Sequence, residues 1–233
     1  DDLSVTADTS EGFNAPLISL TFDDAWASIY TNGLPLLQKY GFVSTQYILT
    51  SSLNTSGYMT NAQVQALYAA GHEIGSHTIT HPDLTKVSTT QLTTELSQSQ
   101  ATLRTLLGPT VANSFASPTG SYNSTTLTAI NQYYQSHRST DVGYNTKDTF
   151  NPYNILVQNI TVSTTTAQVA EWVTKAKTNK SWLVLVYHEV RPSGGDAYTV
   201  TPANLDAQLS VIKASGVDVK TVSQALATLS AQL

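Results

Sequence analysis

The sequence predicts an α/β fold with a mostly parallel core sheet, and it favours a barrel-like closure over an open sheet. Short apolar runs alternate about seven times with longer segments of helical periodicity, which is typical of strand–helix units that build a parallel sheet. The run over 182–187 is apolar at every position, as in strands covered on both faces. No Pro/Gly/Ser-rich linker divides the 233 residues, so we expect a single domain over residues 1–233.

The individual elements follow from local signals. Apolar runs predict strands over residues 17–22, 45–49, 72–76, 113–117, 155–160, 182–187 and 217–219. Gly41 ends a predicted helix over 29–40, and Gly71 ends the next one. Thr60 and Ser88 each stand three residues before a Gln, the spacing of a capping box that begins a helix. Further helices are predicted over 124–134, 166–178, 202–214 and 221–229.

Composition excludes several classes of protein. The net charge is −5, and 11 Lys and Arg residues leave no basic face for a nucleic acid. No apolar run approaches the ~18 residues of a membrane span, so we expect no membrane partner. The absence of cysteine removes disulfides, thiolate nucleophiles and cysteine metal sites. The chain begins at Asp1 without a cleavage pattern, so we expect that a signal peptide was removed or never existed.

Polar residues stand at the C-terminal ends of three predicted strands, the edge that carries the active site in parallel α/β folds. Asp23 and Asp24 follow the first strand; they are either a helix N-cap pair or two carboxylates with different roles, since neighbouring strand residues point to opposite faces. His77 and His81 follow the third and could bind one cation, although the spacing also arises by chance. His188 suits a general acid or base, or is structural.

Taken together, these residues favour a mononuclear metal hydrolase site. An Asp-His-His ligand set leaves positions on zinc for water and substrate, as catalysis requires. The chain has no G-x-S-x-G elbow, no H-E-x-x-H and no phosphate-binding glycine loop, which removes the commonest rival chemistries. We expect His72 and His137 to be structural.

Four motifs, in order and from about Leu17 to the C-terminus, resemble those of the NodB-type polysaccharide deacetylases, carbohydrate esterase family 4. That family shows T-F-D-D-G, H-[ST]-x-x-x-H, R-x-P-Y-G and a strand that ends in a histidine. This chain has TFDDA from Thr21, HTITH from His77, FASPTG from Phe115 and LVLVYH ending at His188.

The resemblance implies a distorted (β/α) barrel that binds one divalent metal ion, usually zinc. It implies that metal-bound water, deprotonated by a carboxylate, attacks an acetyl carbonyl, and that a histidine protonates the leaving atom. When the roles of the family are carried over by position, Asp24, His77 and His81 would bind the metal. Asp23 would be the general base and His188 the general acid. The backbone N–H of Thr119 would donate to the oxyanion.

This chain departs from the family pattern at three positions. Ala25 replaces the glycine after the aspartate pair, Ala116 replaces the loop arginine, and Thr119 replaces the loop tyrosine. The arginine normally orients the catalytic aspartate. We hypothesise that Arg138, on the next strand, reaches the site in its place. Asp141 and Asp148 are the candidates to pair with His188.

Three aromatic residues beside the motifs could contact a sugar, namely Trp26, Tyr122 and Tyr187, although each could equally belong to the core. We therefore expect a secreted, monomeric, metal-dependent deacetylase of a carbohydrate polymer or oligomer. The polymer is either of the chitin or peptidoglycan type, with N-acetylglucosamine, or O-acetylated xylan. Two alternatives stay open, a catalytically degenerate glycan-binding relative and a hydrolase of a small non-sugar amide.

Overall fold

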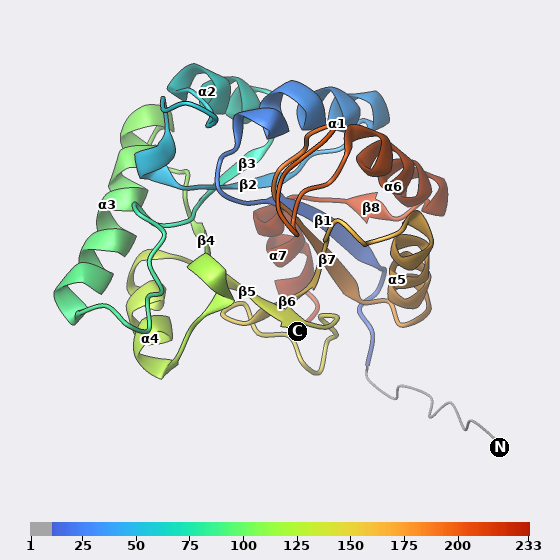
Figure 1. The fold of residues 1–233 in the computed structure, drawn as a ribbon. Helices are drawn as coiled ribbons and strands as arrows, with labels where there is room; N and C mark the ends of the chain where they lie inside the picture. Colours follow the sequence, from blue (N-terminus) through green and yellow to red (C-terminus); the bar gives the residue numbers. More distant parts are fainter. Residues whose placement is uncertain (1–10) are drawn as a thin grey trace.

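Seven parallel strands close into a barrel, and an eighth lies beside the first. The computed structural model describes residues 11–233, so the first ten residues of the predicted domain lie outside the described part. The strands follow the order β2-β3-β4-β5-β6-β7-β1-β8, and an additional pairing of β1 with β2 closes the ring (Figure 1). Their bounds are β1 Leu17–Phe22, β2 Thr45–Ile48, β3 Glu73–Ser76, β4 Ser114–Ala116, β5 Ser136–Val142, β6 Ile155–Asn159, β7 Trp182–Tyr187 and β8 Asp218–Val219.

The barrel closes unevenly around β1. This strand pairs with β7 along its whole length, from Leu17 with Trp182 to Phe22 with Tyr187. On its other edge only its last two residues pair with β2, while its first two pair with β8. The prediction of a distorted (β/α) barrel with a parallel core is therefore confirmed.

Seven helices surround the strands (Figure 1): α1 Leu34–Tyr40, α2 Asn61–Ala69, α3 Thr89–Leu107, α4 Ser124–Tyr133, α5 Thr166–Thr178, α6 Pro202–Ser215 and α7 Val222–Ser230. Thr60 and Gln63 form the predicted reciprocal capping box. Of the capping box predicted at Ser88, only one half is present: Ser88 accepts the N–H of Gln91. Gly41 ends α1 in the left-handed conformation. Among the described helices, none is both long and apolar enough to cross a membrane.

The first predicted helix differs from the observed one. Residues 29–40 do not form one α-helix: Ile29–Gly33 form a π-helical turn, and α1 begins only at Leu34. Pro35 accounts for the break, because it has no N–H to donate to the carbonyl of Thr31 in a continuous α-helix.

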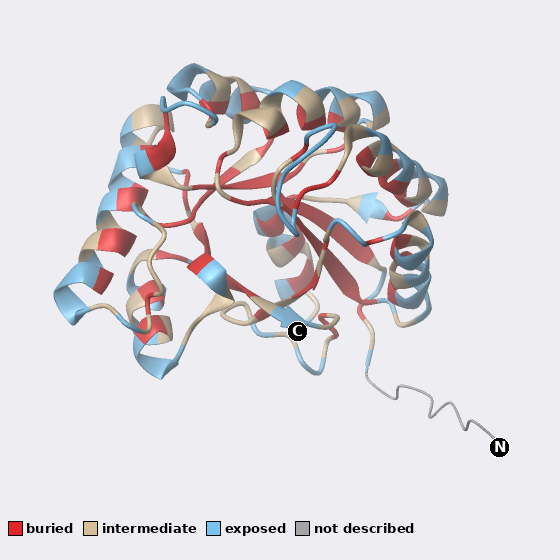
Figure 2. Ribbon diagram, viewed as in Figure 1, coloured by how far each residue is buried: buried red, intermediate tan, exposed pale blue. Residues whose placement is uncertain are grey.

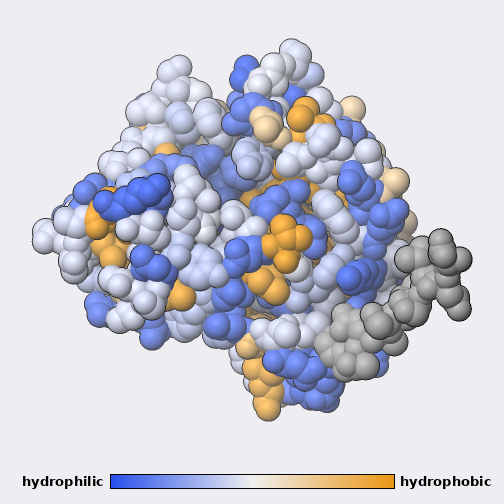
Figure 3. Space-filling model, turned by 60° about the horizontal axis from the view of Figure 1, so that its bottom comes forward, coloured by the Kyte–Doolittle hydropathy of each residue, from blue (hydrophilic) through white to orange (hydrophobic). Residues whose placement is uncertain are grey.

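The core lies inside and around the barrel. All six residues of β1 and of β7 are buried, and Figure 2 shows these two strands in red. Apolar side chains of the helices pack on the outer faces of these strands, as Leu205 and Leu209 of α6 do. On the face seen in Figure 3, hydrophobic side chains form scattered patches among hydrophilic ones. The strand ends are therefore fixed by packing on both sides.

Strand β5 contains no apolar run, which is why the search for apolar runs does not predict it. It reads SHRSTDV, and its first four residues are buried. The imidazole of His137 lies between the hydroxyl of Ser117, 2.8 Å from Nε2, and the carbonyl of Tyr153, 2.9 Å from Nδ1. His72 is buried against Ser44 at the other end of the barrel. Both histidines are structural, as predicted.

Candidate active site

The polar ends of β1, β3, β4 and β7 meet around one cavity of about 470 Å³. It is lined by all six residues to which the family motifs assign metal binding or catalysis: Asp23, Asp24, His77, His81, Thr119 and His188. Residues that are far apart in the sequence therefore form one site, at the edge of the sheet where a parallel barrel carries its chemistry.

Among the described residues, Asp24, His77 and His81 form the only group of three or more histidine, aspartate or glutamate side chains that could hold a metal ion. Their ligand atoms lie within 4.8 Å of one another. Asp24 Oδ1 is 3.4 Å from His77 Nε2 and 3.5 Å from His81 Nε2. His77 Nδ1 lies 2.8 Å from the carbonyl of Ala116, which can only accept, so Nδ1 carries a proton and donates it there, and Nε2 faces Asp24. One carboxylate and two imidazoles suit a divalent cation such as zinc.

The charges within this group are coupled. Burial opposes ionisation of Asp24, but its hydrogen bond to His77 and the nearby histidines outweigh that effect and hold its pKa well below the usual range. Burial likewise disfavours the charged form of His77, yet the hydrogen bond to Asp24 gives it a raised pKa. The pKa of His81 is lowered, by burial and then by the charge of His77. Binding of a metal ion through the two imidazoles therefore competes with their protonation.

The backbone around this group is strained. In the described part of the chain, eight non-glycine residues have a positive φ, and five of them lie in the site or next to a residue of it: Asp24 (71°), Ala25 (64°), Thr78 (70°), His81 (63°) and Thr119 (57°). Each costs on the order of 1–3 kcal/mol, and such residues concentrate at functional sites. The positive φ of Ala25 explains why the family has glycine at this position, since only glycine adopts such a conformation without strain.

Glu95, which the sequence analysis does not identify, holds the loop between the two histidines. It lies buried on α3, and its carboxylate accepts the N–H of Ile79 (2.8 Å), the N–H of Thr80 (3.0 Å) and the hydroxyl of Thr80 (2.5 Å). The available signal was a glutamate on the apolar stripe of the helix, beside Leu92 and Leu96. Burial of a carboxylate there requires such partners.

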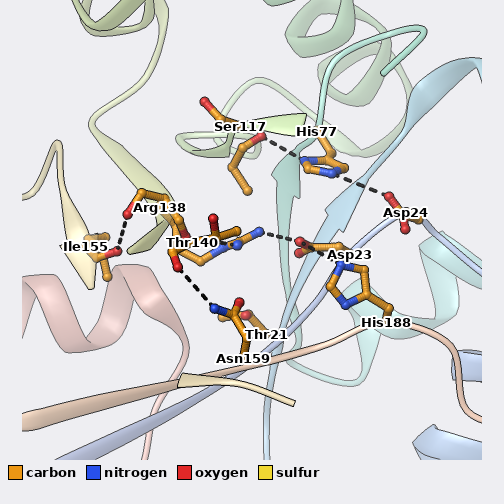
Figure 4. A network of polar contacts seen from close by, with 12 residues as sticks. Thr21, Asp23, Asp24, His77, Ser117, Arg138, Thr140, Ile155, Asn159 and His188 are labelled. Carbon is orange, nitrogen blue, oxygen red and sulfur yellow. Dashed lines mark hydrogen bonds and ion pairs between the residues drawn. The ribbon is translucent and has the colours of Figure 1, made fainter. Parts of the chain in front are cut away.

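Asp23 lies between the side chains of Arg138 and His188 (Figure 4). Its Oδ2 is 2.5 Å from Arg138 Nη2 and 3.8 Å from His188 Nε2. The Arg138 side chain has no exposed surface and that of Asp23 is 4% exposed. Arg138 also donates to the carbonyl of Ser139, and its guanidinium lies 5.1 Å from the ring centre of Tyr47. Arg138 thus crosses from β5 to β1, where the hypothesis places it.

The two oxygens of Asp23 differ in their surroundings. Oδ1 is buried and has no hydrogen-bond partner among the described residues. His188 Nδ1 is likewise buried without such a partner. Neither predicted partner reaches it: Asp141 accepts the hydroxyl of Tyr122, and Asp148 accepts the N–H of Glu11. The prediction that one of these aspartates pairs with His188 is therefore wrong.

The predicted sugar-contacting aromatics do not line the cavity. Tyr187 is fully buried and stacks on Phe22, and its hydroxyl donates to Gln208. The prediction that Tyr187 contacts a sugar is therefore wrong. The reason is strand alternation, since the side chain of Tyr187 points to the opposite side of β7 from that of His188. Trp26 donates from Nε1 to Asp24 Oδ2 (3.2 Å) and so orients a predicted metal ligand.

Tyr122 lies outside the cavity and is held by Asp141 and Asn154. The aromatic residue that does line the cavity is Tyr198, which the sequence analysis does not identify. It lies ten residues after His188, in a glycine-containing loop without any apolar pattern.

Comparisons with known proteins define the class. The polysaccharide deacetylase family matches residues 10–135, more than half of the chain. The chain therefore belongs to the polysaccharide deacetylase family. Among curated proteins, it is 29% identical over 133 residues to the putative polysaccharide deacetylase YxkH of Bacillus subtilis, which covers 56% of this chain and 47% of that relative. The chain thus matches about half the length of this relative.

Solved structures show the same fold. The Xyl-CE4 domain of a multidomain xylanase from the hindgut metagenome of Trinervitermes trinervoides has a TM-score of 0.69 and 22% identity, covering 92% of this chain and 91% of that one. BA3943, a pseudoenzyme of carbohydrate esterase family 4 from Bacillus anthracis, has a TM-score of 0.63 and 18% identity, covering 91% of this chain and 65% of that one. At these identities the likeness concerns the fold alone.

Proposed function

We propose that this protein is a metal-dependent hydrolase that removes acetyl groups from a carbohydrate polymer or oligomer outside the cell. The observation that carries the proposal is the arrangement of Asp24, His77 and His81 in one cavity with Asp23 and His188. A ligand set without a proton acceptor beside it would indicate metal binding alone. Here the carboxylate of Asp23 is held by a buried arginine and keeps one oxygen free.

Asp24, His77 and His81 would hold the cation, with zinc the ion that two imidazoles and a carboxylate suit best. When bound there, a divalent cation polarises a carbonyl and lowers the pKa of water. Asp23 Oδ1 accepts the proton of the attacking water. Arg138 keeps the other oxygen in place, so that Oδ1 stays oriented. The N–H of Thr119 donates to the oxygen of the acetyl carbonyl as negative charge develops on it. His188 Nε2 donates a proton to the leaving nitrogen or oxygen.

The substrate is an acetylated carbohydrate, either an N-acetylglucosamine polymer or O-acetylated xylan. The family supports this class, and the similar Xyl-CE4 domain is part of a xylanase. Both substrates therefore belong in the first test.

The test is acetate release from chitooligosaccharides and from acetylxylan by protein loaded with zinc. We expect release from at least one, its loss on chelation, and its return when zinc is added back. Asp23→Asn should abolish release while zinc content is retained. Asp206→Asn is the matched control, because Asp206 pairs with Lys39 on the surface and does not line the cavity.

Two outcomes would contradict the proposal. Binding of the oligosaccharides without acetate release would identify a degenerate glycan-binding relative. Hydrolysis of small non-sugar amides alone would identify a different substrate class.

A further inference from the structure

The loop between β7 and α6 places one exposed aromatic ring beside the predicted general acid. Tyr198 is 46% exposed and lines the cavity together with His188. The centres of the two rings are 5.0 Å apart, with an interplanar angle of 41°. Of the tyrosine, tryptophan and phenylalanine residues that the structure describes, only Tyr198 lines the cavity.

Tyr198 is held in place rather than left on a loose segment. At the base of the loop, the N–H of Val200 donates to the carbonyl of Glu189 (2.9 Å), and the N–H of Arg191 donates to the carbonyl of Val200 (3.1 Å). At its tip, the N–H of Tyr198 donates to Asp196 Oδ1 (2.8 Å). The backbone that carries the ring is fixed in this way, which lowers the entropic cost of presenting the apolar face of the ring to a ligand.

The rest of the lining is rich in neutral polar groups. Thr140, Asn159 and Thr161 contribute hydroxyl and amide groups, and the amide of Asn159 donates to the carbonyl of Thr140 (Figure 4). The described lining residues include no lysine or arginine. They do include a third carboxylate, Asp196, in addition to Asp23 and Asp24. Such a cavity favours hydroxyl-bearing ligands without negative charge.

We propose that Tyr198 is the platform for the sugar, and that an uncharged pyranose ring which bears the acetyl group stacks on it. This inference rests on the proposed function, because it uses His188 as the donor to the leaving atom. The leaving atom is bonded to a ring carbon, so the ring must lie next to His188 and hence next to Tyr198. The C–H face of the ring then covers the exposed face of the tyrosine, while its hydroxyl groups meet Thr140, Asn159 and Thr161.

The test compares Tyr198→Ala and Tyr198→Phe with the wild type. Two substrates are used, an acetylated oligosaccharide and a small acetyl ester without a sugar ring. We expect Tyr198→Ala to lower the ratio of kcat/KM for the oligosaccharide to that for the ester about tenfold, from loss of the buried aromatic face. Tyr198→Phe should keep the ratio. Tyr68→Ala is the matched control, since Tyr68 is 40% exposed but lies on α2, away from this cavity. An unchanged ratio in Tyr198→Ala would overturn the proposal.

A binding measurement separates this proposal from the proposed function. Calorimetry in the Asp23→Asn background requires no turnover. There we expect chitotetraose or acetylated xylotetraose to bind about tenfold more weakly after Tyr198→Ala, even if no acetate is ever released. An acetylated oligogalacturonate should bind at least tenfold more weakly than the neutral oligosaccharides. Equal binding with and without the tyrosine ring, or tighter binding of the oligogalacturonate, would refute the platform for an uncharged sugar.

Discussion

Replacing Arg138 by alanine removes the only cation that the Asp23 carboxylate contacts within hydrogen-bond distance. Both side chains are buried, so the carboxylate would be left without a partner in a place that water reaches poorly. Breaking a buried ion pair in this way costs about 3–5 kcal/mol. We therefore expect the free energy of unfolding to fall by that amount, a large part of the 5–15 kcal/mol of a typical domain.

The effect on catalysis should be separable from the effect on stability. Arg138 contacts no proposed metal ligand, so zinc content should stay unchanged while kcat falls at least tenfold, because Asp23 loses its fixed orientation. KM should change little. Arg138→Lys keeps the charge and most of the stability. However, one ammonium cannot reproduce the planar fork that holds both Asp23 and the Ser139 carbonyl, so kcat should still fall.

The assays are urea unfolding, zinc content by elemental analysis, and acetate release at temperatures where the variants are folded. Arg104→Ala is the matched control: Arg104 donates to Val111 and Asn113 but lies outside the cavity. Losing those two hydrogen bonds should cost about 2 kcal/mol and leave kcat unchanged. A folded, zinc-loaded Arg138→Ala or Arg138→Lys protein with wild-type kcat would refute the reasoning.

Two further predictions concern buried polar groups. Glu95→Ala should weaken zinc binding 10–100-fold in a competition assay with a chromogenic chelator, because the loop between the histidines loses the acceptor of three hydrogen bonds; unchanged affinity would exclude Glu95 as a positioning residue. Burial lowers the pKa of His137 to about 4, from 6.5 in the unfolded chain. As the pH falls, His137 therefore takes up a proton in the unfolded state before it does so in the folded state. The stability that depends on neutral His137 is fully present above pH 6.5 and is lost as the pH falls toward 4. The free energy of unfolding should fall by about 3 kcal/mol over this pH range. In His137→Gln this pH dependence should be absent when urea unfolding is measured at several pH values.

The parts of this molecule that depend on short-range signals could be predicted from the sequence. The capping residues Thr60 and Ser88 lie within three residues of the groups that they bind, and Gly41 supplies a conformation that few other residues adopt. The six residues of the candidate site that the family motifs identify also follow from the sequence, because each stands directly after an apolar strand or within the loop that follows one. Parallel pairing brings such positions to one edge.

Other parts depend on tertiary contacts that no local pattern contains. The buried half of β5 is polar because Arg138 finds Asp23 across the barrel and His137 finds Ser117. Glu95 and Tyr198 acquire their places only when α3 and the loop after β7 pack around the cavity. Tyr187 is different, because strand alternation alone places its side chain on the opposite side of the strand from His188. This pattern could have excluded Tyr187 as a residue that contacts a sugar.

The position of β1 in the barrel has a consequence for how the protein is made. This apolar strand ends at Phe22, whereas its full-length neighbour, β7, begins only at Trp182, so β1 is synthesised well before β7. At roughly 5–20 residues per second, a ribosome needs on the order of ten to thirty seconds to make the chain from one strand to the other. Throughout that time β1 lacks its main partner, and contacts this distant in sequence also form slowly. The N-terminal half contains all three proposed metal ligands but has no β7 against which to pair β1, so the nascent chain must be kept from aggregating until its second half exists.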